Sequence, residues 1–103
     1  MIYHVKTSET AELEMKEIAD YISDILYSPQ AAYNLMYELR KQVRTLNQMP
    51  KRYALVSDER LAKNGIRAIP VKNYSIFYTV DDQTLTVTII NVMHSGRDWV
   101  NLL

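Results

Sequence analysis

The stretch IRAIPVKNYSIFYTVDDQTLTVTIINVM, residues 66–93, decides the fold because it contains three runs rich in β-branched and aromatic side chains. The runs cover residues 66–71, 74–80 and 85–93, and the connections between them are short enough to join neighbouring antiparallel strands. Pro70 has no N–H to donate, so we expect an edge or a bulge in the first strand. The stretch therefore predicts an antiparallel meander.

The residues before this stretch predict a short strand and two amphipathic helices. Residues 2–7 alternate apolar and polar side chains, as a short strand does. Apolar side chains then recur every three or four positions in two runs, residues 9–26 and 29–46, which Ser28-Pro29 separates. We expect Ser8 and Ser28 to cap the two helices, which together form a hairpin.

These elements predict an α+β fold in the order β-α-α-β-β-β. Packing the helical hairpin on one face of a mainly antiparallel four-stranded sheet buries both apolar stripes economically. The opposite face of the sheet would then stay open to carry function. Residues 51–64 lack periodicity and are expected to form a long connection, and residues 97–103 a short helix.

Length and composition exclude several classes of protein. A chain of 103 residues fits one domain, residues 1–103. The absence of cysteine excludes disulfides, thiolate metal sites and a cysteine nucleophile. No run approaches the ~20 apolar residues of a membrane helix, and the first residues do not resemble a leader, so we expect a cytoplasmic protein without membrane contact.

Charge is distributed unevenly although the net charge is zero. Residues 1–39 have a balance of −5, residues 40–72 a balance of +7, and the remainder −2. If the middle block folds onto one face, it would attract phosphate or an acidic partner. The alternative is a solvated connection whose bases are balanced by nearby acids.

Several short motifs, in their order and spacing, resemble the RelE/ParE superfamily of bacterial type II toxins. They are Ile-Ala-Asp-Tyr-Ile at 18–22, Ser-Pro-Gln-Ala-Ala at 28–32, Gly-Ile-Arg at 65–67, Asn-Tyr-Ser-Ile-Phe-Tyr at 73–78 and Val-Met-His-Ser-Gly-Arg-Asp-Trp at 92–99. The resemblance implies a small toxin that a cognate antitoxin, encoded beside it, holds silent. It leaves two targets open, because some relatives cleave mRNA on the ribosome and ParE-type relatives poison DNA gyrase.

Cleavage of mRNA would need a base for the 2′-hydroxyl, cations for the phosphorane and an acid for the leaving oxygen. His94 is the candidate base or acid, because imidazole titrates near neutrality and this residue precedes a glycine-containing loop. The position is similar to that of a histidine on the last strand of some ribosome-dependent relatives. The alternatives are a histidine that only stabilises the last turn, or a structural histidine of the kind that gyrase poisons also show at this position.

Arginine suits phosphate stabilisation because its planar guanidinium can hold two oxygens and keeps its charge. Arg67 and Arg97 are the candidates, and Arg97 lies close enough to His94 in sequence for a tight loop to bring both to one substrate. Arg97 could instead pair with Asp81, Asp82 or Asp98. Further bases are expected to bind the substrate RNA: Lys51, Arg52, Arg60, Lys63 and Lys72.

Three departures from the nuclease pattern keep the target open. Nuclease-type relatives carry an arginine where this chain has Ser75, and by our alignment a second arginine and a tyrosine at Ser95 and Asn101. We therefore weigh three functions: ribosome-dependent mRNA cleavage, slightly favoured by His94 and the basic block; gyrase poisoning; and a decayed domain that only binds antitoxin. For the antitoxin we expect an acidic segment on residues 40–72, with apolar anchors beside the hairpin.

No other chemistry is indicated. His4 and His94 are far apart in sequence, and no clustered carboxylates support a metal site. A nucleophile elbow and a glycine-rich phosphate loop are both absent. We therefore expect neither a metal nor a small-molecule cofactor.

Overall fold

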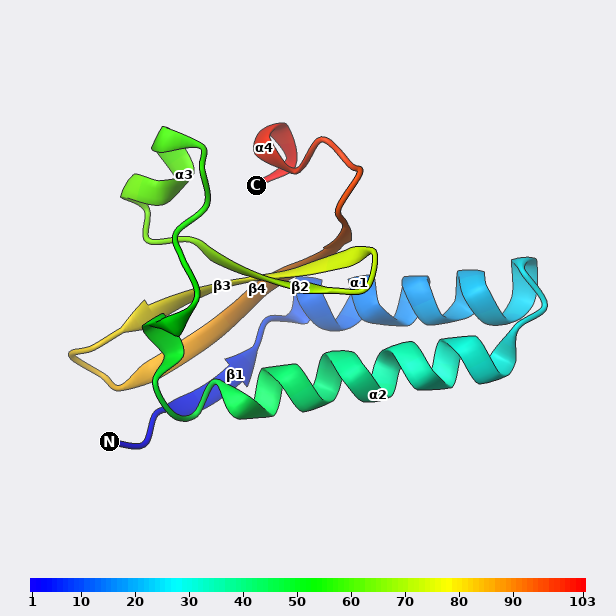
Figure 1. The fold of residues 1–103 in the computed structure, drawn as a ribbon, viewed down its shortest axis with the longest axis horizontal. Helices are drawn as coiled ribbons and strands as arrows, with labels where there is room; N and C mark the ends of the chain where they lie inside the picture. The colour runs from blue at the N-terminus through cyan, green and yellow to red at the C-terminus, as the bar shows by residue number, and fades with distance from the viewer.

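The computed structural model describes residues 1–103, and its sheet has the predicted strands (Figure 1). Four strands, β1 (His4–Thr7), β2 (Arg67–Val71), β3 (Tyr74–Asp81) and β4 (Thr86–His94), form one sheet in the order β1-β4-β3-β2. The strands β2, β3 and β4 are antiparallel neighbours, and β1 pairs with β4 in parallel. The predicted α+β fold is confirmed.

The helical elements comprise the predicted hairpin and several shorter pieces. They are α1 (Glu9–Asp20), the π-helical turn η1 (Tyr21–Ile25), α2 (Pro29–Thr45), the 3-10 turn η2 (Pro50–Arg52), α3 (Glu59–Lys63) and α4 (Trp99–Leu102). The hairpin of α1, η1 and α2 projects beyond one end of the sheet, and α3 and α4 lie on the other side of it (Figure 1). No helix combines the length and apolar character needed to span a bilayer.

The starts of the two long helices differ in their capping. The Ser8 hydroxyl accepts a hydrogen bond from the Ala11 N–H at 3.0 Å, which satisfies one of the free donors at the start of α1. At α2, Pro29 occupies the first turn, but the Ser28 hydroxyl donates to the Leu26 carbonyl and does not cap the helix. Ser28 therefore occupies the expected N-cap position, but its side chain does not cap the helix, because its hydroxyl bonds within the hairpin connection.

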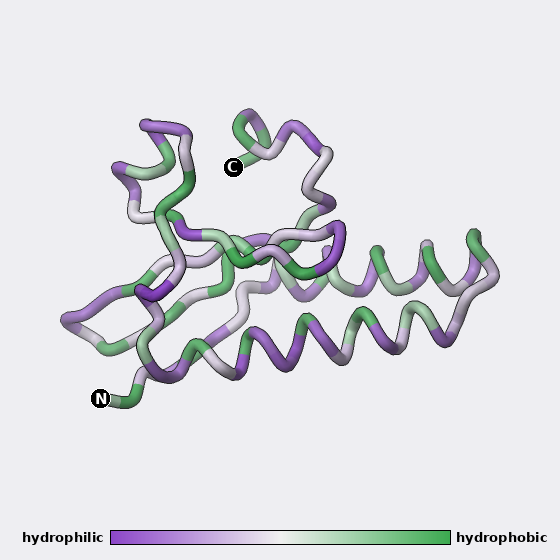
Figure 2. The backbone as a smooth tube through the Cα atoms, viewed as in Figure 1, coloured by the Kyte–Doolittle hydropathy of each residue, from purple (hydrophilic) through white to green (hydrophobic).

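The main core lies between the hairpin and the sheet. Leu39 and Leu46 from the α2 region pack with Met15 of α1 against Ile76 and Val87 of the central strands, and all five are at most 1% exposed. The apolar segments of both helices alternate with polar ones along the hairpin (Figure 2). Burial of one stripe on each helix therefore holds the hairpin on this face.

The opposite face of the sheet is not bare, contrary to the sequence expectation. Phe77 and Met93 point to this side and form a second core with Leu61 of α3, and the Phe77 ring lies 5.4 Å from the ring of Trp99 in α4. The Asp58 side chain accepts a hydrogen bond from the Leu61 N–H at 3.0 Å and starts α3 within the expected long connection. A helix of five residues is too short to produce a visible apolar period.

Tyr78 makes stability sensitive to alkaline pH. Its side chain is fully buried in the main core, and its hydroxyl donates to the Pro50 carbonyl at 2.6 Å. Burial raises the pKa of Tyr78 to about 12, so the folded state favours the neutral phenol. The unfolded tyrosine ionises near 10, so we expect the free energy of unfolding to decrease as pH rises from about 10 to about 12.

A urea titration at several pH values measures this loss. Tyr78→Phe should be less stable at neutral pH by about 1 kcal/mol, because the Pro50 carbonyl loses its donor, and its stability should fall less steeply above pH 10. Equal slopes for the wild type and Tyr78→Phe would contradict the assignment. The raised pKa values of Tyr3 and Tyr74 leave a residual slope in both proteins.

Candidate functional site

The candidate site lies where the hairpin projects past the end of the sheet. His94, the last residue of β4, pairs with Tyr74, the first residue of β3, and their rings meet edge to face at 5.3 Å. Tyr21 of η1 lies beside them, since the three residues line both of two adjoining hollows. A strand pair and a helical turn therefore position this aromatic group together.

The two hollows differ in size and lining. The larger has a volume of about 610 Å³ and is bordered by the apolar residues Ile22, Leu26 and Leu35 of the hairpin, with Lys72 at the turn between β2 and β3. The smaller has a volume of about 290 Å³, and its charged lining consists of Glu14, Glu17 and Arg97. Both hollows have a largely apolar lining, and the smaller one also carries two carboxylates and a guanidinium.

The hydrogen bond of His94 defines its neutral tautomer. Its Nδ1 accepts from the Gly96 N–H at 3.0 Å, so in the neutral ring the proton lies on Nε2. Nε2 is then a donor toward a ligand, and the lone pair that a base needs is engaged by the backbone. A Cβ at Gly96 would lie 3.1 Å from this Nδ1, so the close approach depends on the glycine.

Arg97 shares the smaller hollow with His94. The Arg97 N–H donates to the His94 carbonyl at 3.0 Å, which closes the tight loop that the sequence spacing suggested. The exposed guanidinium makes no ion pair, either with the three aspartates considered above or with any other acid. His94 and Arg97 are therefore the two predicted catalytic residues that the structure brings together.

Arg67 lies elsewhere. It pairs across the sheet with Tyr78, which is four residues along β3 from Tyr74, or about 13 Å at the rise of a strand. Its guanidinium donates to the Tyr53 carbonyl at 2.7 Å and to the Lys51 carbonyl at 3.4 Å. These bonds hold η2 and the following Tyr53 against the sheet, and they direct Arg67 away from His94.

The predicted substrate-binding bases are dispersed, and most have partners within the chain. Arg52 donates to the Gln48 carbonyl at 2.9 Å in the turn after α2, Arg60 donates to the Val100 carbonyl at 2.7 Å, and Lys63 lies 3.6 Å from Glu59. Lys51 forms an ion pair with Asp82, which holds the pKa of that carboxyl below its usual value.

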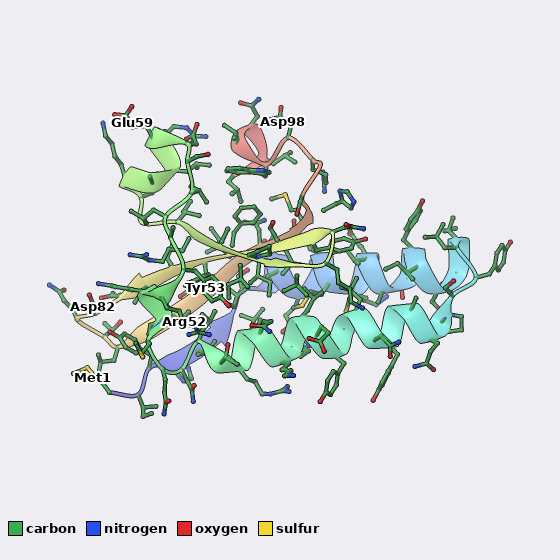
Figure 3. The ribbon with its side chains drawn as sticks, viewed as in Figure 1. Met1, Arg52, Tyr53, Glu59, Asp82 and Asp98 are labelled. Atoms are coloured by element: carbon green, nitrogen blue, oxygen red, sulfur yellow. The ribbon has the colours of Figure 1, made fainter.

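Their positions also differ, because Arg52 and Asp82 lie at the end of the molecule near the N-terminus, and Glu59 lies on α3 across the sheet (Figure 3). Of the five predicted substrate-binding bases, Lys72 alone borders the larger hollow. The basic block of residues 40–72 therefore does not form one face.

Sequence reasoning missed Glu14, which lies at the smaller hollow. Its Oε1 accepts from the Asn91 side chain at 3.0 Å and from the Val92 N–H at 3.1 Å. The pairing of β3 with β4 shifts between Phe77 and Tyr78 and leaves Ile90 opposite no residue. Glu14 accepts hydrogen bonds next to this bulge, so it stabilises the segment of β4 that leads to His94. A glutamate on a helix gives no sequence signal for such a contact.

Removal of Glu14 should therefore weaken the fold. We expect Glu14→Ala to lower the free energy of unfolding by about 1–3 kcal/mol, because a partly buried amide and a strand N–H lose their acceptor. Glu14→Gln keeps an oxygen acceptor and should lose less. Urea denaturation measures both, with Glu17→Ala as the matched control because Glu17 makes no hydrogen bond or ion pair. Equal losses for Glu14→Ala and Glu17→Ala would contradict the assigned role.

Two of the three departures from the nuclease pattern, Ser75 and Ser95, lie in contact. The hydroxyls of Ser75 and Ser95 lie 3.0 Å apart and share a hydrogen bond. The third departure, Asn101, donates from its side chain to Asp98 at 2.7 Å within α4. At positions 75 and 95 the chain therefore has a pair of neutral hydroxyls.

The chain is similar to a known family and to several solved structures. The family described as "ParE toxin of type II toxin-antitoxin system, parDE" matches residues 5–99. No curated protein gives a significant sequence match.

Among solved structures, the chromosomal ParDE system from P. aeruginosa aligns with a TM-score of 0.73 at 19% identity, over 90% of this chain and 96% of that chain. A RelE toxin mutant from E. coli in the free state aligns with a TM-score of 0.70 at 17% identity, over 99% and 93%. The RelBE2 toxin-antitoxin complex from Mycobacterium tuberculosis aligns with a TM-score of 0.64 at 20% identity, over 91% and 99%. These likenesses show a common fold.

Proposed function

Because the chain belongs to the ParE toxin family of type II toxin-antitoxin systems, its partner is a cognate antitoxin, and we propose that its target is DNA gyrase. The proposal is that the toxin poisons gyrase and does not cleave mRNA. A gyrase poison needs a surface that holds the enzyme in a DNA-cleaved state, and it needs no cations for a phosphorane of its own. This requirement separates the two targets that the resemblance left open.

The serine pair carries the proposal. Ser75 and Ser95 occupy adjacent positions, and neither hydroxyl supplies the positive charge that a pentacoordinate phosphate requires. The loss of such preorganised donors costs several kcal/mol of transition-state stabilisation, on the order of a hundredfold or more in rate for each donor. Arg67, the other arginine candidate besides Arg97, is held by backbone carbonyls away from His94. The ParE family match supports the same target.

Ribosome-dependent mRNA cleavage is the second candidate, and the placement of His94 beside Arg97 favours it. In this mechanism the Nε2–H of His94 would donate to a phosphate or to the leaving oxygen, and Arg97 would stabilise the developing charge. Another group would have to remove the 2′-hydroxyl proton, because the lone pair of Nδ1 is engaged by Gly96. Lys72 borders the larger hollow together with His94 and would be a further cation.

An assay with purified gyrase tests the proposal. The toxin is incubated with gyrase, ATP and supercoiled plasmid, and the products are treated with detergent and protease. We expect linear plasmid, because a poison traps the enzyme with both DNA strands cut. Toxin saturated with its antitoxin is the control and should leave the plasmid supercoiled.

A parallel primer extension on mRNA from a translating extract tests the second candidate. Intact plasmid together with mRNA cut inside translated codons would overturn gyrase as the target. Intact mRNA together with linear plasmid is the expected result. His94→Ala added to the extract would show whether any cuts depend on the imidazole.

A further inference from the structure

We propose that the two hollows beside His94 form one docking groove, and that a segment of the antitoxin fills it with an aliphatic side chain and a neighbouring lysine or arginine. The inference rests on membership of the toxin family and is independent of whether gyrase or the ribosome is the target. It assigns both a location and a chemistry to the antitoxin contact.

The larger hollow suits an aliphatic side chain. Its border of Ile22, Leu26 and Leu35 is apolar, and its volume of about 610 Å³ exceeds what one large side chain needs. Around it the tip of the hairpin leaves Tyr21, Ile25 and Leu26 half or more exposed. A contiguous exposed apolar surface on a small domain marks a site of interaction with another macromolecule. This tip projects beyond the sheet and is accessible from several directions (Figure 1).

The smaller hollow suits a cation. Glu14 and Glu17 contribute two carboxylates to it, and Arg97 contributes one guanidinium, so the lining keeps a net negative charge. Only one oxygen of Glu14 is engaged by the sheet, which leaves the other for a partner. The rings of Tyr21 and Tyr74 border the same space, and aromatic faces attract ammonium and guanidinium groups.

The acids of the hairpin favour a protein segment over a nucleic acid as the occupant. The segment from α1 through η1 carries six acids, of which Asp20 is paired with Lys16 and Glu12 with Arg40, so four acids make no ion pair. Such a surface repels a phosphate backbone, since nucleic-acid binding depends on neutralising phosphates with bases. A basic segment of a protein has the complementary charge. The antitoxin is the protein partner that the family provides.

This site differs from the contact that the sequence suggested. An acidic antitoxin segment on residues 40–72 would require free bases there, and six of the nine bases are already bonded to acids or carbonyls of the chain. The acids at the groove are less engaged, because Glu17 makes no ion pair. The apolar anchors expected beside the hairpin fit the new location.

Calorimetric titration of the purified toxin with the antitoxin encoded beside it tests the groove. Leu26→Asp places a charge among the apolar walls, and Glu17→Arg reverses the charge of the smaller hollow. We expect each to weaken binding by about tenfold or more, as loss of a central contact at an interface does. The controls are Tyr33→Ala, an exposed tyrosine on α2 outside the groove, and Glu59→Arg on α3, and both should bind within about twofold of the wild type.

A charge exchange sharpens the test. Each lysine and arginine of the antitoxin is changed in turn to glutamate, and one of these variants should bind Glu17→Arg more tightly than it binds the wild type. Wild-type affinity for both Leu26→Asp and Glu17→Arg would overturn the groove. If Leu26→Asp and Glu17→Arg lose gyrase poisoning but keep their antitoxin affinity, the proposed antitoxin site is also overturned. The groove would then be a contact surface for gyrase. The plasmid assay of the free wild-type toxin reports separately on the proposed target.

Discussion

Phe77→Ala is expected to lower the free energy of unfolding by about 3–5 kcal/mol, the usual cost of truncating a buried phenylalanine. Phe77 is 2% exposed and joins the sheet to both short helices on the outer face, since it packs in one cluster with Leu61 and with the ring of Trp99. Removal of the ring leaves a cavity in the second core, where the sheet, α3 and α4 meet. Because a small domain is stable by about 5–15 kcal/mol, the loss is a large part of the total.

Thermal and urea unfolding followed by circular dichroism measure this loss. The matched control is Leu102→Ala in α4, whose side chain is half exposed and should cost no more than about 0.5 kcal/mol. The fluorescence emission maximum of Trp99 in Phe77→Ala should also shift toward that of a solvent-exposed tryptophan. Equal stability of the two variants would show that α3 and α4 do not depend on Phe77.

Leu39→Ala is expected to destabilise the fold by about 2–5 kcal/mol through the main core. Leu39 is fully buried between the hairpin and the sheet, and the void left by three carbons has no neighbouring solvent to fill it. Leu13→Ala, on α1, makes the same chemical change at a side chain that is 54% exposed, and it should be nearly neutral. Urea midpoints of the two variants measure the difference. Similar midpoints would contradict the placement of the hairpin.

The strands were predictable because their signals are local. Residues 66–93 combine β-branched runs with short turns, and the structure has β2, β3 and β4 there with the expected antiparallel pairing. The hairpin was predictable for a similar reason, since its apolar stripe has a helical period over many turns. Long periodic segments and tight turns can be predicted from the local sequence alone, because the pattern that indicates them does not depend on distant residues.

Features that depend on contacts distant in sequence were not predictable. The bulge in β4 lies beside the Glu14 carboxylate, 77 residues away in sequence from the Asn91 that it bonds. The second core forms because α3 and α4, each too short to show a period, meet over Phe77. The direction of Arg67 likewise depends on the carbonyls of a turn that precedes it by 14 residues.

The candidate site was predictable in part. The proximity of His94 and Arg97 follows from a tight loop, which sequence spacing indicates. Tyr21 and Tyr74 border the same hollow only because the hairpin packs beside the end of the sheet. The spacing of these residues in the sequence does not indicate that packing. The same limitation applies to Ser75 and Ser95, whose absence of charge was visible but whose contact across two strands was not.

Measuring gyrase trapped on DNA in cells tests most directly whether a toxin with the neutral Ser75–Ser95 pair poisons gyrase and does not cleave RNA. The toxin is induced without its antitoxin, gyrase is immunoprecipitated under denaturing conditions, and covalently attached DNA is quantified beside the 5′ ends of mRNA. Trapped DNA is expected to rise within minutes, before any change in the 5′ ends. New 5′ ends inside translated codons, without trapped DNA, would contradict the proposal.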